Sequence, residues 1–127
     1  MATFKKKIGD LGEDIACDYL VKNRWRIVSR NYRRKADEID IIAIAADNTL
    51  VFCEVKALLL RGDRNDDGLM PEDNLTAAKL MKISRTCEFF TRQNPHMINE
   101  EKGWRIDLLA IDIDLNGASN IRHYENI

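Results

Sequence analysis

The chain has 127 residues (14.7 kDa), enough for one compact domain that buries about two-thirds of its extended surface and needs no disulfide or metal to hold a core. Hydrophobic residues make up 45% of the chain and charged residues 32%, and no apolar run approaches the roughly 20 residues of a membrane span. The three cysteines are far apart and odd in number, and no secretory signal is present, so we expect free thiols in a cytoplasmic protein that does not enter a membrane.

The net charge of −1 is unevenly distributed along the chain. Residues 1–35 contain ten Lys or Arg and four acidic residues, a balance of +6, which leaves −7 for the remainder. Such a basic block could neutralise the phosphates of a nucleic acid, although a charge run is also typical of a plain solvated surface. The candidate phosphate-binding residues of the block are Arg24, Arg26, Arg30, Arg33, Arg34 and Lys35.

The first predicted element is an amphipathic helix from about Lys5 to Asn23, with Thr3 as its N-terminal cap. Its apolar residues recur at intervals of three and four, at Ile8, Leu11, Ile15 and Tyr19. Glu13 falls at the border of this apolar stripe, where it could lean over a neighbouring sheet. A surface acid beside Lys or Arg fits the same spacing equally well.

Residues 25–32 predict a strand, and residues 36–56 predict two further apolar strands joined by a tight polar turn. Alternation would place Asp40 on one face with Ile42, and Ile39 with Ile41 on the other. A three-residue loop at 47–49 would pair Asp40 with Lys56 and place Glu54 diagonally across, roughly 7 to 8 Å away. A two-residue loop would separate the two acids onto opposite faces unless a bulge intervened. We expect the odd-length loop or a bulge.

Asp40, Glu54 and Lys56 are the three charged residues that interrupt these apolar strands. Two converging carboxylates could hold a hard divalent cation by their oxygens, with the ammonium of Lys56 beside it. Buried charges are also often simply paired with one another, so a structural Asp40–Lys56 pair remains the alternative.

Beyond the hairpin the sequence predicts a long, mobile loop from about residue 58 to residue 74. A second helix follows from about Leu75 to Gln93, capped by Asp73 or Asn74, and its Lys79 and Lys82 could reach a phosphate or be ordinary surface lysines. Strands are expected at residues 104–114 and 121–124. Asp107 in the first of them could be a further buried acid or a structural partner of Arg105 or Lys56.

Several ordered motifs together resemble the uncharacterised bacterial YraN-like family, within the PD-(D/E)XK restriction-endonuclease-like superfamily that includes Holliday-junction resolvases. The resemblance spans nearly the whole chain. Two positions depart from the family pattern, namely Asp37 in place of a glycine and Arg61, which comes later than the usual arginine. The matching motifs are Gly12-Glu13 with Ala16, Arg30-Asn31-Tyr32-Arg33, Glu38-Ile39-Asp40, Phe52-Cys53-Glu54-Val55-Lys56, Lys79 and Arg105-Ile106-Asp107.

This resemblance implies a single α/β domain over residues 1–127, with a central mixed β-sheet flanked by two main helices in the order α-β-β-β-α-β-β. It implies a metal-dependent DNA endonuclease in which Asp40 and Glu54 bind Mg²⁺ or Mn²⁺, with the Val55 carbonyl as a third ligand. Lys56 would orient or activate the attacking water, and Glu13 would act as an outer ligand. The alternative function is a non-catalytic nucleic-acid-binding module on the same fold. A homodimer is compatible with the sequence but does not follow from it.

Overall fold

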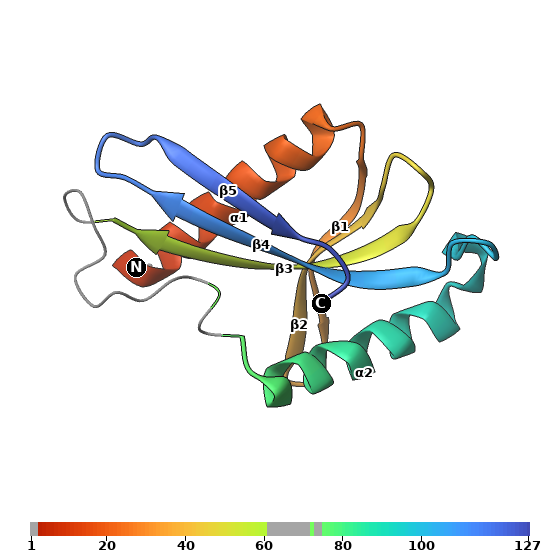
Figure 1. Ribbon diagram of the computed structural model, residues 1–127. Coiled ribbons are helices and arrows are strands. Elements are labelled where there is room, and N and C mark those ends of the chain that lie inside the picture. Colours follow the sequence, from red (N-terminus) through yellow and green to blue (C-terminus); the bar gives the residue numbers. More distant parts are fainter. Residues whose placement is uncertain (1–2, 61–71, 73–74) are drawn as a thin grey trace.

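The computed structural model describes residues 3–60, 72 and 75–127 and shows a five-stranded sheet with one long helix on each face (Figure 1). The order of helices and strands, α-β-β-β-α-β-β, confirms the predicted fold class. No helix in the described part of the chain is long and apolar enough to cross a membrane. The elements are α1 (Phe4–Lys22), β1 (Arg26–Arg34), β2 (Asp37–Ile44), β3 (Leu50–Leu59), α2 (Ala77–Gln93), the 3₁₀ helix η2 (Pro95–Met97), β4 (Trp104–Ile113) and β5 (Ser119–Tyr124).

The strands lie in the sheet in chain order, and only the β3–β4 pair is parallel. The crossover between β3 and β4 carries α2, as a parallel connection requires a long return segment. β3 therefore lies at the centre, antiparallel to β2 on one side and parallel to β4 on the other. Figure 1 shows the β1–β2 hairpin turning steeply away from the plane of β3, β4 and β5.

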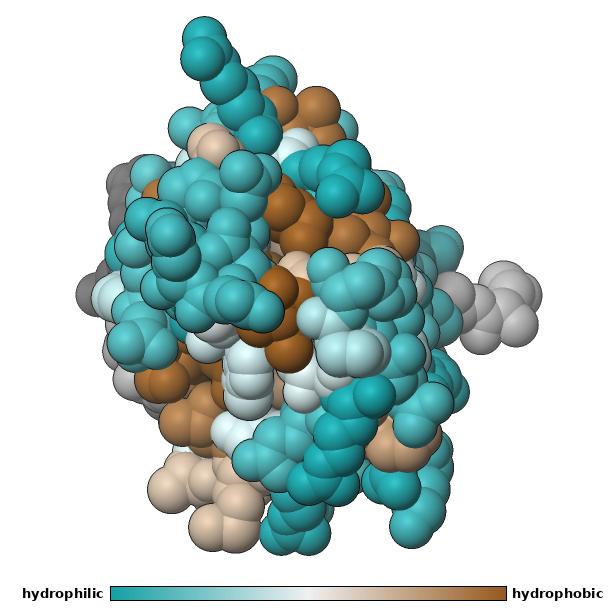
Figure 2. Space-filling model, turned by 90° about the vertical axis from the view of Figure 1, so that its right-hand side faces the viewer, coloured by the Kyte–Doolittle hydropathy of each residue, from teal (hydrophilic) through white to brown (hydrophobic). Residues whose placement is uncertain are grey.

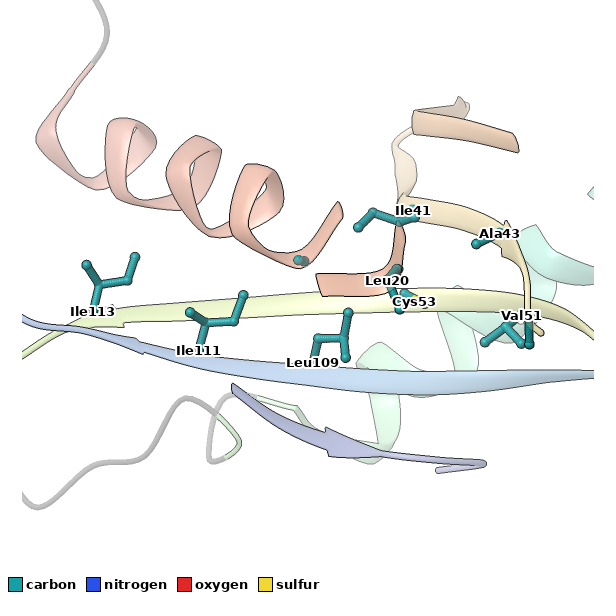
Figure 3. Close-up of a cluster of buried hydrophobic side chains, with 10 residues drawn as sticks. Leu20, Ile41, Ala43, Val51, Cys53, Leu109, Ile111 and Ile113 are labelled. Atoms are coloured by element: carbon teal, nitrogen blue, oxygen red, sulfur yellow. The ribbon is translucent and has the colours of Figure 1, made fainter. Parts of the chain in front are cut away.

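Each face of the sheet has its own hydrophobic core. On the α1 side, Ala16 and Leu20 of the helix pack against residues from β2, β3 and β4 (Figure 3). On the α2 side, Ile83, Cys87 and Phe90 pack against a second set that includes Phe52. Both faces of β3 are thus buried, which explains why this strand is apolar almost throughout.

α1 lies unusually close to β3 at Gly12. A Cβ atom added to Gly12 would come within 2.6 Å of the Cβ of Ala57, far inside van der Waals contact. The helix starts as predicted, because the Thr3 hydroxyl accepts a hydrogen bond from the Lys6 backbone N–H at 3.1 Å. The close contact at Gly12 brings the next residue, Glu13, to the surface of the sheet.

Several predicted boundaries are wrong. β3 continues three residues past Lys56, because Ala57 to Leu59 pair with the parallel strand β4. α2 begins at Ala77, with Thr76 rather than Asp73 or Asn74 as its cap, and the Thr76 hydroxyl accepts from the Lys79 N–H at 3.2 Å. Most of the predicted mobile loop, residues 61–71 and 73–74, lies outside the described residues.

Candidate active site

The turn between β2 and β3 sets the register of the two strands that carry the acidic residues. The Ala45 N–H donates to the Thr49 carbonyl at 2.9 Å, which closes a three-residue loop at 46–48. Within it the Asp47 carboxylate accepts from the Thr49 N–H at 3.1 Å, and Asn48 adopts a left-handed conformation with φ 72°. The odd loop length is confirmed, but the loop lies one residue earlier than predicted, because the buried Thr49 already belongs to the strand pair.

This register brings the two acids of the site to the same end of the β2–β3 ladder. The ladder ends at the pair Ile41–Cys53, and Asp40 and Glu54 are the next residues of the two strands, just beyond this last pair. The predicted pairing of Asp40 with Lys56 is therefore wrong. The loop lies one residue earlier than predicted, which shifts the pairing by two residues along β3. Instead, the Asp40 carboxylate accepts a hydrogen bond from the backbone N–H of Val55 at 2.7 Å. A side chain thus takes the place of the next ladder bond, at the point where the strands diverge.

The alternation of side chains between the two faces of the sheet is interrupted at Asp40 of β2. Ile39 and Ile42 both pack on the α2 side of the sheet whereas Ile41 packs on the α1 side, so the predicted shared face of Ile39 and Ile41 is wrong. On β1, the residue level with Asp40 is Asn31, which has φ 53°. A left-handed residue in a strand bends it locally, in the manner of a bulge. The bend in β1 and the break in β2 therefore occur at the same level.

The two carboxylates are shielded from water and close enough to influence each other. Burial, followed by the negative charge of Glu54, raises the pKa of Asp40 to about 8. Burial also raises the pKa of Glu54, against the opposing charge of Lys56. The Glu54 side chain is 12% exposed, and its Oε1 lies 3.1 Å from the Nζ of Lys56, which is 27% exposed. Both shifts favour the neutral, protonated forms of the two carboxyl groups.

Glu13 joins this site from α1. Its side chain is 14% exposed, and within the described part of the chain its buried Oε1 has no hydrogen-bond partner. Burial raises the pKa of Glu13 while the nearby Arg30 lowers it, and the negative charge of Glu38 raises it further. The Arg30 guanidinium lies 3.8 Å from Glu13 Oε1, beyond hydrogen-bond distance, and binds Asp14 at 2.8 Å instead.

Asp40, Glu54 and Glu13 do not form a closed metal-binding cluster. Among residues 3–60, 72 and 75–127, no three His, Cys, Asp or Glu side chains come together in an arrangement that could hold a metal ion. A cation at this place would have Asp40 and Glu54 as its carboxylate ligands and would need main-chain oxygen and water for the rest. All of these are hard oxygen donors, the set that Mg²⁺ and Mn²⁺ prefer.

The predicted basic block divides into three groups rather than forming one surface. Arg33, Arg34 and Lys35 lie at the tip of the β1–β2 hairpin, where the Arg34 guanidinium lies 4.0 Å over the ring of Phe89 on α2. Lys82 on the same helix is exposed, and so is Lys79 in its first turn. Together the hairpin tip and this helix form a basic area, which we call the hairpin–α2 surface; its residues are Arg33, Arg34, Lys35, Lys79, Lys82 and Arg85.

The remaining arginines of the block lie elsewhere. Arg30 faces α1 through its ion pairs with Glu13 and Asp14. Arg24 directly follows the end of α1, and Arg26 lines an open cavity of about 520 Å³ at the far end of β1, together with Ile44, Asn48 and residues 96–99. Figure 2 shows the side of the molecule where the β2–β3 turn and the end of α2 lie, on which small hydrophobic patches are scattered among hydrophilic residues.

Asp107 has a structural role and does not take part in the site. The Asp107 carboxylate is fully buried and accepts hydrogen bonds from Arg105 at 2.9 Å and from the Asn126 N–H at 3.0 Å, while His123 Nε2 lies 2.7 Å away. Although burial raises the pKa of Asp107, the hydrogen bonds with His123 and Arg105 lower it overall. Its predicted alternative partner, Lys56, contacts Glu54 instead.

Sequence reasoning did not assign a role to Asn31 or Glu38. Asn31 is exposed and level with Asp40, and its side chain lowers the pKa of Glu13, while Glu38 raises the pKa values of Glu13 and Glu54. The available signal for Asn31 was an asparagine inside a strand, since asparagine is rare in strands and tolerates left-handed conformations.

Comparison with known proteins gives consistent matches to one family. The model of "Uncharacterised protein family UPF0102" matches residues 12–111. A UPF0102 protein of Campylobacter concisus is 37% identical over 103 residues, 81% of each chain, and one of Geobacter sulfurreducens is 35% identical over 122 residues, 95% of this chain and 88% of the relative. Among solved structures, Pyrococcus furiosus SfsA in complex with Ca²⁺ is similar at 15% identity and a TM-score of 0.40, over 95% of this chain and 63% of that one.

Proposed function

Since the chain belongs to the uncharacterised protein family UPF0102, we propose from the geometry of its own residues that it is a metal-dependent endonuclease that hydrolyses phosphodiester bonds of DNA. The observation that carries the proposal is the pair of partly buried carboxylates, Asp40 and Glu54, which follow the last pair of the β2–β3 ladder, with Lys56 beside Glu54. In metal-assisted phosphodiester hydrolysis, acidic side chains hold the cation and a positively charged group stabilises the charge that develops on the phosphate. Asp40 and Glu54 could do the first and Lys56 the second, at the point where β2 and β3 diverge.

The electrostatics of the pair favour a cation. Two carboxylates that are shielded from water repel each other. Burial and the charge of Glu54 raise the pKa of Asp40 to about 8, so the metal-free site disfavours two negative charges. We assign Mg²⁺ or Mn²⁺ to Asp40 and Glu54, with the Val55 carbonyl as a third ligand. When bound, the ion would polarise the phosphoryl oxygen and make a bound water more acidic.

The other residues have distinct tasks in this proposal. The ammonium of Lys56, held 3.1 Å from Glu54, would orient the attacking water and offset the charge that develops on the phosphate. The free Oε1 of Glu13 would accept a hydrogen bond from water in the site. The hairpin–α2 surface would hold the DNA backbone by its phosphates. Three free cysteines suit the reducing cytoplasm, where we place this activity.

The test is incubation of the protein with linear, single-stranded, flapped and four-way DNA in Mg²⁺, Mn²⁺ or EDTA. We expect cleavage of at least one substrate with metal and none with EDTA. Lys56→Met should keep Mn²⁺ affinity, measured by calorimetry, because the oxygen ligands remain, but lower the cleavage rate by about 10² to 10³. Lys102→Met, on an exposed loop residue, is the matched control and should cleave like wild type.

Two results together would contradict the nuclease proposal. If the wild-type protein cuts no DNA in the panel and Lys56→Met lowers the free energy of unfolding by about 3 to 5 kcal/mol without metal, Lys56 is a structural counter-ion of two buried acids. In that case a protein that still binds DNA without regard to Mg²⁺ is a non-catalytic nucleic-acid-binding module.

A further inference from the structure

The open cavity at the far end of β1 lies apart from the proposed active site. Arg26 pairs with Ile44, and directly paired residues of a sheet point to the same face. Because Ile44 packs on the α2 side, Arg26 points to that side as well. The cavity thus lies between the paired ends of β1 and β2, the β2–β3 turn and η2, at the end of the molecule that Figure 2 faces. Its volume of about 520 Å³ is within the usual range of small-molecule sites.

The floor of the cavity is aliphatic. Its apolar lining residues are Ile44, Met97 and Ile98, and all three belong to the partly buried outer layer of the core on the α2 side. Among the described residues the lining contains no Phe, Tyr or Trp. A flat aromatic ligand would therefore find no large ring to stack on, whereas branched side chains and a flexible thioether adapt to an aliphatic body.

The polar groups around this floor are hydrogen-bond donors. Asn99 Oδ1 accepts from the backbone N–H groups of residues 101–102 at 2.9 and 3.2 Å, which fixes the amide and leaves its NH₂ group available. The exposed Arg26 forms no ion pair with any residue that the structure describes. His96 and Asn48 add a ring nitrogen and a further amide. The described lining contains no Asp or Glu, so it suits an anion and offers no counter-ion to an ammonium group.

We propose that this cavity binds the carboxylate of a small aliphatic acid, with Arg26 and the Asn99 amide as donors and the aliphatic floor under the hydrocarbon body of the acid. Arg26 is the one permanent charge in the described lining. It matches the single charge of a carboxylate better than the charge of about −1.5 to −2 on a phosphate monoester at neutral pH. The planar guanidinium also binds a carboxylate by two parallel hydrogen bonds.

The test is the binding of 4-methylvalerate, a branched aliphatic carboxylate, to the full chain, followed by NMR titration. We expect a Kd on the order of 1 mM, as is usual for a small ligand in an open site. The amide 4-methylvaleramide keeps the hydrocarbon body without the charge and should bind at least about tenfold more weakly. Acetate keeps the charge without the body and should lose affinity to a similar extent.

Two substitutions locate the ligand. Asn99→Asp keeps the oxygen that accepts the N–H groups of residues 101–102 and replaces the NH₂ group with a negatively charged oxygen. It should melt like wild type and bind 4-methylvalerate at least about tenfold more weakly, and so should Arg26→Gln, which removes the charge. Arg24→Gln, at an exposed position outside the lining, is the matched control and should bind like wild type. If one of the two variants does not fold, the other decides.

The outcomes separate the site from its ligand. Failure of 4-methylvalerate to bind, or unchanged affinity in Asn99→Asp and Arg26→Gln, overturns the site. Tighter binding of inorganic phosphate or dAMP than of 4-methylvalerate overturns the assignment of a carboxylate. Tighter binding of N-acetylleucine would identify the C-terminus of a peptide as the source of the carboxylate, and tighter binding of 4-methylvalerate a free acid; both results support the site. None of these results bears on the nuclease, since the cavity shares no residue with the proposed active site.

Discussion

At the scale of single residues, the surroundings of Asp40 exert two opposing effects on the protonation of its carboxyl group. Its carboxylate accepts the Val55 N–H, which favours the charged form, while burial and the charge of Glu54 favour the neutral form and prevail. The raised pKa of Asp40 therefore makes the stability of the metal-free protein depend on pH. A group whose pKa is higher in the folded state than in the unfolded state stabilises the fold at low pH and loses that contribution as pH rises.

The first prediction follows from the sign of this shift. As pH rises from about 4, the ordinary value, to about 8, the value in the fold, Asp40 should progressively lower the free energy of unfolding of the metal-free protein. Asp40→Asn keeps an oxygen to accept the Val55 N–H but cannot ionise. At pH 8 it should be more stable than wild type by on the order of 3 kcal/mol, at about 1.4 kcal/mol per pKa unit with allowance for relaxation.

Urea denaturation of both proteins in EDTA at pH 5 and pH 8 measures this difference. At pH 5 the difference should be about one third of that at pH 8, because the pH is then only about one unit above the ordinary pKa of the carboxyl group. Parallel pH profiles for Asp40→Asn and wild type would show that Asp40 is ionised in the metal-free fold. Addition of Mn²⁺ should stabilise wild type but not the Asn variant, since the variant lacks one carboxylate ligand.

At the scale of elements, the contact between α1 and β3 decides whether Glu13 reaches the site. Gly12→Ala introduces a Cβ within 2.6 Å of the Ala57 Cβ, and neither atom can rotate away. We expect a loss of about 1 to 3 kcal/mol in the free energy of unfolding, typical of overpacking. The displacement of α1 should also weaken Mn²⁺ binding, because it carries Glu13 away from Asp40 and Glu54.

Two further variants make the test of the Gly12 contact specific. Gly9→Ala lies on the same helix with nothing within 4 Å of the added Cβ, so it should stabilise the protein by about 0.5 to 1 kcal/mol through helix propensity. Gly12→Ala combined with Ala57→Gly removes the clash and should recover most of the lost stability and metal affinity. If the combined variant recovers neither, the close helix–sheet contact is not the cause.

The helices, strands and loops also show how much of the fold could be predicted from the sequence. The α1 helix with its Thr3 cap, the order of helices and strands along the chain and the odd-length β2–β3 loop followed from local spacing and turn chemistry. The predicted register was wrong by two residues along β3, because a three-residue loop fits the polar turn in two ways that differ by one residue, and the burial of Thr49, a tertiary property, selects one. The extension of β3 to Leu59 depends on pairing with the distant strand β4, which periodicity does not reveal.

For the site, sequence reasoning brought Asp40, Glu54, Lys56 and Glu13 together, and the structure does so too. It assigned no role to Asn31, since the left-handed φ of 53° that this residue adopts between two paired positions of β1 cannot be inferred from local spacing. It also treated the six basic candidate residues between Arg24 and Lys35 as one surface. A strand extends by about 3.3 Å per residue, so residues 26 and 34 of β1 lie at opposite ends of the sheet.

At the scale of the whole molecule, the distribution of charge predicts where DNA binds. The hairpin–α2 surface groups basic residues at one end of β1, whereas Arg24 and Arg26 lie at the other end. Arg33→Glu with Arg34→Glu should weaken DNA binding strongly and lower the slope of log affinity against log salt by about 2, because each phosphate that is no longer neutralised reduces the slope by about 0.9. Fluorescence anisotropy at several salt concentrations, in Ca²⁺ to prevent cleavage, measures both.

The matched control is Arg24→Glu with Arg26→Glu, which changes the net charge by the same amount at the opposite end of β1. This variant should keep the salt slope of wild type, because its residues touch no phosphate in the proposed complex. Equal losses of affinity in the two double variants would show that DNA responds to net charge rather than to the hairpin–α2 surface.

The burial of Cys53 gives the protein a natural chemical reporter. Its thiol is fully buried at the last pair of the β2–β3 ladder, between Phe52 and the acidic Glu54, and burial raises its pKa well above the ordinary value. Cys17 is only half-buried and should react with alkylating reagents while the fold is intact. The Cys53 thiol lies in the core on the α1 side of the sheet. Its slower alkylation therefore measures how often this core opens locally, in the natural sequence and without an introduced label.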